Sequence, residues 1–126
     1  MYIYQRKSKM KKILLLMYIS ISLVNANDLI HPLDFKDTKA AKEKVMQFIV
    51  NGVKETYTKI GMGSPSMLRM MEKEELSSFK KLTKVENRKL LDSIITQYCN
   101  IGMCNYNAIL MMYNNENEAL KKKLDW

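Results

Sequence analysis

The sequence predicts an all-α fold: a small four-helix domain of αα-hairpin type with one disulfide, preceded by an N-terminal signal peptide. Three observations support this prediction. Apolar residues recur at helical spacing in four segments, and no segment of any length alternates as a strand would. Residues that favour turns and helix caps separate these segments. The two cysteines of the chain, Cys99 and Cys104, lie between the third and the fourth of these segments.

Residues 1–26 have the layout of a secretory signal peptide. A lysine- and arginine-rich stretch precedes an apolar run from Ile13 to Val24, and Val24-Asn25-Ala26 matches a cleavage site with small residues. The apolar run is shorter than the ~20 residues that span a membrane. We expect cleavage after Ala26 and a periplasmic or secreted protein that meets the membrane only during export. The alternatives are a buried or membrane-anchoring helix and, for the start of translation, Met10 in place of Met1.

Export would also remove most of the positive charge. The full chain has a formal net charge of +8, which is typical of proteins that bind nucleic acid. Five of the 21 basic residues and none of the 13 acidic ones lie in the signal peptide, so the mature chain keeps a charge of +3. We therefore expect no nucleic-acid partner.

The mature chain is long enough for one domain, which we place at residues 37–126. Residues 27–36 are predicted to form an extended leader, because His31 precedes Pro32 and the residue before proline avoids helical backbone angles. We expect this histidine, the only one in the chain, to be a solvated surface residue.

The four helices are predicted from their apolar stripes and from the residues at their ends. Ser64 caps the second helix and Pro65 takes its first position. The charged middle of that helix, Glu72 to Glu75, is expected to face water. The predicted bounds are Asp37 or Thr38 to Gly61, Pro65 to about Lys81, Thr83 to Cys99, and Asn105 or Asn107 to the end of the sequence.

The third helix is predicted to start at Thr83, because Thr83-Lys84-Val85-Glu86 has the pattern of a capping box. With the preceding Leu82, this stretch resembles the Leu-Thr-x-x-Gln motif of the Spy/CpxP-type periplasmic chaperones. Those are small, exported, all-helical proteins that bind unfolded clients on an apolar face. The resemblance covers about a dozen residues, with one copy of the motif in place of two and Glu86 in place of glutamine, so it does not assign the chain to that family.

The cysteines predict a bent connection between the third and fourth helices. In an unbroken helix the Cα atoms of Cys99 and Cys104 would lie roughly 8.7 Å apart, beyond the ~7 Å that a disulfide tolerates. Gly102 offers a break, because glycine readily adopts the left-handed conformation that ends helices. Disulfides persist outside the cytoplasm, so we predict a Cys99–Cys104 bond at the corner of a helical hairpin. The alternative is two free thiols in a reducing compartment.

Methionine is the unusual feature of the composition, and it suggests two functions. Methionine-rich surfaces adapt to protein partners, whereas clustered thioethers are soft ligands that select Cu(I). We expect binding to another protein, such as a client chain or an envelope or secretion component, and keep Cu(I) binding as the alternative. The candidate partner-binding residues are Met67, Met70, Met71, Met111, Met112 and Tyr113.

No catalytic constellation is evident in the sequence. The single histidine lies in the predicted leader, and each cysteine is predicted to be occupied by the other. The glycines lack the spacing of a phosphate-binding loop. We therefore expect neither enzymatic activity nor a cofactor.

Overall fold

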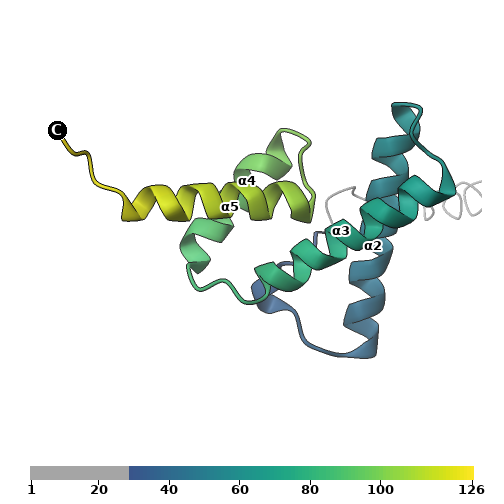
Figure 1. Ribbon diagram of the computed structural model, residues 1–126. Helices are drawn as coiled ribbons and strands as arrows, with labels where there is room; N and C mark the ends of the chain where they lie inside the picture. The colour runs from purple at the N-terminus through teal and green to yellow at the C-terminus, as the bar shows by residue number, and fades with distance from the viewer. Residues whose placement is uncertain (1–28) are drawn as a thin grey trace, which may run out of the picture.

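The computed structural model describes residues 29–126, so the predicted signal peptide, its cleavage site and the alternative start at Met10 lie outside the described residues. Within 29–126 the chain is helical and contains no strand, as predicted. A short 3-10 helix precedes four α-helices (Figure 1). The elements are η1 (Pro32–Asp34), α2 (Lys39–Lys59), α3 (Pro65–Leu82), α4 (Arg88–Asn100) and α5 (Tyr106–Lys121). None of the described helices combines the length and the apolar character needed to cross a membrane.

Each α-helix begins at a side chain that accepts a hydrogen bond from a free backbone amide of the first turn. The predicted cap Ser64 is confirmed. Thr38 is the correct choice of the two residues considered for α2, and Asn105 of the two considered for α5. The Asn105 Oδ1 atom accepts from the amide of Ala108 at 2.8 Å.

The predicted start of the third helix at Thr83 is wrong. Thr83 ends α3, and its hydroxyl donates to the carbonyl of Lys80 at 2.7 Å. α4 begins at Arg88, where the side chain of Asn87 accepts from the amide of Leu90 at 3.0 Å. A threonine hydroxyl can serve the end of one helix as well as the start of the next, and asparagine is the better cap. The residues that resemble the chaperone motif therefore do not start a helix here.

Two glycines end helices in the same way. Gly61 follows α2 with φ of +74°, and Gly102 follows α4 with φ of +80°. In each case the next amide reaches back to close the turn: Met62 donates to Tyr57, and Met103 to Tyr98, both at 2.9 Å. This pattern is the Schellman motif, which a left-handed glycine permits.

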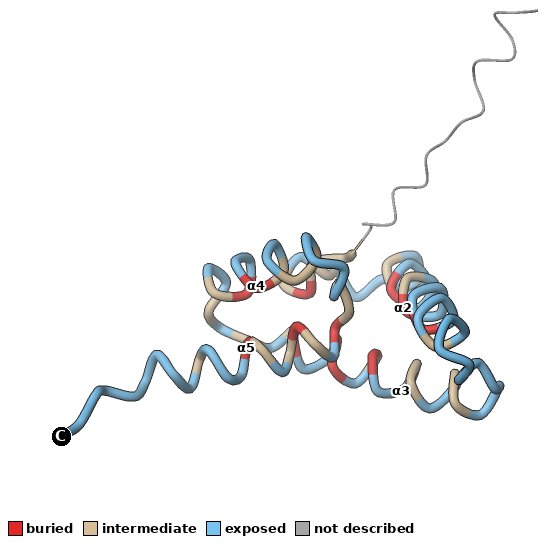
Figure 2. Tube along the Cα trace, turned by 90° about the horizontal axis from the view of Figure 1, so that it is seen from above, coloured by how far each residue is buried: buried red, intermediate tan, exposed pale blue. Residues whose placement is uncertain are grey.

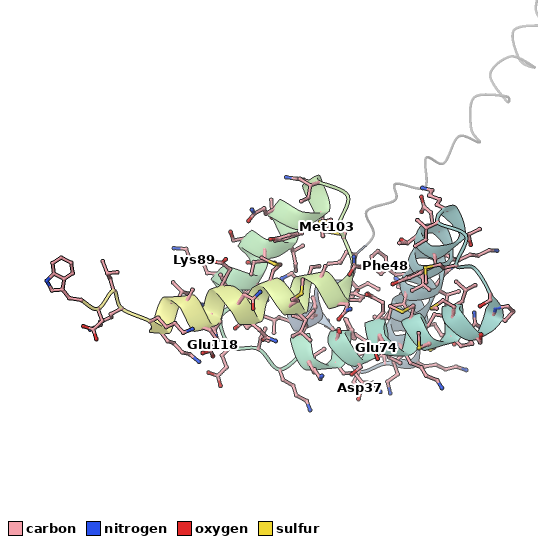
Figure 3. The ribbon with its side chains drawn as sticks, turned by 45° about the horizontal axis from the view of Figure 1, so that its top comes forward. Asp37, Phe48, Glu74, Lys89, Met103 and Glu118 are labelled. Carbon is pink, nitrogen blue, oxygen red and sulfur yellow. A yellow bond between two sulfur atoms is a disulfide. The ribbon has the colours of Figure 1, made fainter. Side chains whose placement is uncertain are left out.

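The Gly102 turn brings Cys99 and Cys104 together, with Cα atoms 4.1 Å apart and a disulfide between them. The predicted bridge at the corner of a helical hairpin is confirmed. The corner lies between α4 and α5, where Figure 3 labels Met103.

Replacing Cys99 and Cys104 together by serine is expected to lower the free energy of unfolding by about 2 kcal/mol, because the unfolded chain regains the freedom that the short loop removes. Urea unfolding followed by circular dichroism, with and without reductant, measures this change. Reductant should destabilise the parent protein and leave the double variant unchanged. An equal response of the two would contradict a native disulfide.

The helices pack in the spatial order α2, α3, α5, α4, with η1 against α3. The fold thus consists of two helical hairpins, α2–α3 and α4–α5, joined where α3 meets α5 (Figures 1 and 2). Buried residues lie on the inward faces of all four α-helices, while most outer helix faces are exposed. The buried apolar residues are Val45, Ile49, Val53, Phe79, Leu82, Leu91, Ile94, Tyr106, Ile109 and Tyr113.

Tyr106 lies at the centre of the core and has no exposed surface. Its ring contacts those of Phe79 and Phe48 edge-on, with centroids 4.8 and 5.4 Å away. Figure 3 shows Phe48 where α2 approaches the start of α5. The Tyr106 hydroxyl donates to the carbonyl of Ile30 at 3.0 Å, which fixes the segment before η1 onto the core.

Candidate functional site

The predicted partner-binding residues of α3 differ in their exposure. Met70 is 51% exposed, so a partner can reach it. Met67 and Met71 are half-buried, and Met71 packs against the core. The three share one turn of the helix, but only Met70 presents most of its side chain to solvent.

The predicted residues of α5 divide in the same way. Met111 is 55% exposed, and Met112 is half-buried against the core. Tyr113 is buried, and its hydroxyl oxygen accepts a hydrogen bond from the backbone amide of Asn87 at 3.1 Å. It therefore anchors the start of α4 and offers no surface to a partner, so we remove Tyr113 from the candidate site.

The structure does not bring the two methionine groups together. The first half of α3, with Met67, Met70 and Met71, lies beside α2, whereas α5 runs away from α2 (Figure 1). α3 meets the start of α5 through residues that follow the methionines: the Ser78 hydroxyl donates to Asn107 Oδ1 at 3.2 Å. A single continuous methionine face is therefore not formed.

An apolar groove lies between α2 and α3. We define the α2–α3 groove by its lining residues, which enclose a hollow of about 220 Å³: Met46, Ile49, Val50, Arg69, Glu72, Lys73 and Leu76. Met46 and Val50 are 47% and 38% exposed, whereas Ile49 is buried beneath them. The groove therefore has an apolar floor that is open to solvent.

Charged side chains of both signs form the rim of the α2–α3 groove on α3. Arg69 Nη2 lies 2.6 Å from Glu72 Oε1, which fixes these two groups as an ion pair. Lys73 makes no ion pair with any residue in the part of the chain that the structure describes. Such a rim suits an amphipathic helix, whose apolar face enters the groove while its polar face stays in water.

Met46 and Val50 were missed by the sequence reasoning, although a signal was present. The buried positions of α2 are Val45, Ile49 and Val53. Met46 and Val50 each follow a core position by one residue, about 100° around the helix. They widen the apolar face beyond the stripe that one neighbouring helix can cover.

Glu75 has a structural role. The expectation that residues 72–75 face water is wrong for it and holds only in part for Glu72, whose side chain is 14% exposed. Glu75 is only 7% exposed, and its carboxylate accepts from the amides of Tyr106 at 2.8 Å and Asn107 at 3.2 Å. These are the first two amides of α5, which have no partner inside their own helix. Burial raises the pKa of Glu75, and the two amides act in the opposite direction.

His31 is likewise held within the fold, contrary to the expectation of a solvated residue in an extended leader. Its Nδ1 atom accepts from the amide of Leu33 at 3.1 Å, which caps η1. The remaining ring proton therefore lies on Nε2, which donates to Asp92 Oδ1 at 2.6 Å. The guanidinium of Arg88 on α4 donates two hydrogen bonds, of 2.8 and 2.9 Å, to the carboxylate of Asp34. This contact lowers the pKa of Asp34.

These contacts attach η1 to α4 across more than 50 positions of sequence, which explains why local patterns did not show them. The role of His31 is therefore structural, because it holds η1 against α4. Within residues 29–126 no group of three or more histidine, cysteine, aspartate or glutamate side chains is arranged to hold a metal ion.

Comparison with known proteins returns no relative: no protein-family model, no curated protein and no solved structure matches this chain.

Proposed function

We propose that this chain is a small exported helical protein that acts by binding another protein, and that the α2–α3 groove is its contact surface. The observation that carries the proposal is the open apolar floor of this groove, in which Met46 and Val50 remain exposed above buried Ile49. Export is supported by the signal-peptide layout of residues 1–26 and by a disulfide of the kind that persists outside the cytoplasm.

The chemistry of the groove favours an amphipathic helix or a similar apolar segment as the bound element. Met46 is flexible and polarisable, so it can adapt its shape to different apolar side chains. Arg69 and Lys73 are exposed beside the groove and offer positive charge to the polar edge of such a segment, whereas the Glu72 side chain is only 14% exposed and pairs with Arg69. These properties suit a chaperone-like protein or an accessory factor of the envelope or of secretion.

Replacing Val50 with aspartate is expected to weaken partner binding at least tenfold, because binding would remove water from a carboxylate on the apolar groove floor. Val50 is partly exposed, so the free protein should keep its helical content and its unfolding midpoint. The measurement is suppression of aggregation of an unfolded client, together with capture of partners from an envelope extract. Met111→Asp, an exposed substitution outside the groove, is the matched control.

A photo-cross-linking residue at position 50 locates the contact directly, with position 111 as its control. Cross-links confined to position 50 and lost in competition with unlabelled protein would support the proposal. Equal cross-linking at the two positions, or full activity of Val50→Asp, would contradict it.

The second candidate function is Cu(I) binding by the methionines of α3. Its support is that Met67, Met70 and Met71 lie on one helical turn, with Met70 accessible from solvent. Calorimetric titration with Cu(I) under reducing conditions tests it. Sub-micromolar binding that is lost when all three are replaced by leucine would favour copper, and weak binding that survives the replacement would exclude this site.

A further inference from the structure

α5 continues beyond the helices that cover it. Its buried residues, Tyr106, Ile109 and Tyr113, all lie in its first half. Leu120 is 68% exposed, and Leu124 and Trp126 are completely exposed. Both views show the end of α5 and the residues after it extending away from the rest of the fold (Figures 1 and 2). We call residues 120–126 the terminal segment.

Three consecutive lysines, Lys121 to Lys123, lie among these exposed apolar residues, against one acidic residue, Asp125, within the segment. Lys121 contacts Glu118 at 3.4 Å. Lys122 and Lys123 form no ion pair within residues 29–126. The terminal segment therefore combines unpaired positive charge with uncovered apolar surface.

The surroundings of the terminal segment add charge of both signs. A hollow of about 350 Å³ beside it is lined by Lys84 and Lys121 as well as by Glu86. Together with Glu118 and Asp125, Glu86 offsets part of the positive charge. The lysines nevertheless outnumber the acids within the segment, and two of them are free to meet an anionic partner.

We propose that the terminal segment docks on the surface of an anionic lipid bilayer. Tryptophan and leucine bury readily at the boundary between headgroups and acyl chains. Lysines beside them are attracted to anionic headgroups and can extend along the interface to reach them. Leu124 and Trp126 are both completely exposed, so neither has to leave the core to enter the interface.

This inference goes beyond the proposed protein-binding function and does not rest on it, because the terminal segment and the α2–α3 groove lie on different helices. It differs from the expectation that the protein meets a membrane only during export. The docking is peripheral, and it requires no membrane-spanning helix.

Trp126 provides a local reporter, because it is the only tryptophan in the chain. The full chain is titrated with vesicles of equal parts phosphatidylglycerol and phosphatidylcholine, and with vesicles of phosphatidylcholine alone. We expect the Trp126 emission to shift to shorter wavelength at a lipid concentration roughly tenfold or more lower for the anionic vesicles. High salt should reverse the shift. Lipid binding elsewhere in the chain does not by itself change this signal.

The matched variants carry the same change of charge at two places. Replacing Lys121, Lys122 and Lys123 by glutamine should abolish the shift, whereas replacing the exposed α2 lysines Lys39, Lys44 and Lys54 should leave it intact. No shift with anionic vesicles, an equal shift with neutral vesicles, or an equal loss in both triple variants would overturn the proposal. A concentration-dependent shift without lipid would also overturn it, since it would assign the segment to a second copy of the chain.

Discussion

Replacing Tyr106 with alanine is expected to lower the free energy of unfolding by about 3–5 kcal/mol, the range for removing a large buried aromatic ring. The ring is fully buried and contacts Phe48 of α2 and Phe79 of α3, so its loss opens a cavity where three helices meet. The hydroxyl also holds the carbonyl of Ile30. Since small domains have only about 5–15 kcal/mol of stability, this change removes a large part of it.

Urea unfolding followed by circular dichroism measures the effect, with Tyr106→Phe as the matched control. Phenylalanine keeps the ring and loses only the hydrogen bond to Ile30, which is expected to cost about 1 kcal/mol. Burial raises the pKa of Tyr106 above that of a free tyrosine, so the hydroxyl remains protonated and able to donate at neutral pH. Equal losses in the two variants would show that the ring does not fill the core as described.

Replacing Glu75 with alanine is expected to cost about 2–4 kcal/mol, because it leaves the amides of Tyr106 and Asn107 without acceptors. These amides belong to the first turn of α5 and lie where α3 packs against it. Glu74→Ala is the matched control, since its neighbouring carboxylate is exposed. The measurement is the free energy of unfolding in urea, and comparable losses in both variants would contradict the assigned role.

The pH dependence of this effect follows from the direction of the Glu75 pKa shift. Burial raises the pKa of Glu75 above its ordinary value of 4.5. Around and above pH 4.5 the folded state therefore holds this proton more tightly than the unfolded state does, and stability decreases as pH rises through the folded pKa. Glutamine does not titrate, so Glu75→Gln lacks this dependence. The free energy of unfolding of the parent protein, relative to that of the variant, should therefore be greatest near pH 4.5 and fall as the pH rises toward 7. An advantage that instead grows between pH 4.5 and 7 would contradict the shift.

The helical fold could be predicted from the sequence largely because its determinants are local. The side chains of the caps Ser64 and Asn105 bind backbone amides three residues further along the chain. Gly102 lies between the apolar stripes of two helices, where the chain must turn, and adopts the left-handed conformation. The disulfide was predicted from the signal-peptide layout, because disulfides persist outside the cytoplasm. The bend at Gly102 followed from it, because an unbroken helix would hold the Cα atoms of Cys99 and Cys104 too far apart for a bond. Thr83 shows the limit of local reasoning, because its hydroxyl had two possible backbone partners and the pattern did not choose between them.

The buried position of Glu75 could have been predicted from helix geometry. Four consecutive residues occupy most of the circumference of a helix at 100° each, so a charged run cannot face water entirely. Glu75 stands four and seven residues before Phe79 and Leu82, on the core stripe of α3. The acceptor role of its carboxylate, by contrast, depends on Tyr106 more than 30 positions away and could not be read locally.

The candidate site was predicted only in part, for a related reason. Methionine content directed attention to α3 and α5, and Met70 and Met111 are indeed exposed. The groove itself depends on how α2 and α3 pair, which determines that Met46 and Val50 stay open while Ile49 is covered. Composition names the adaptable residue types, but only the packing shows which of them a partner can reach.

The central claim is that the chain leaves the cytoplasm and works in its oxidised, hairpin form. Intact mass and N-terminal sequencing of protein recovered from its native cells, after treatment with an alkylating reagent, test it most directly. The account predicts an N-terminus at Asn27 and no alkylation of Cys99 or Cys104 before reduction. Native protein that retains Met1 or Met10 and is alkylated at both cysteines would contradict it.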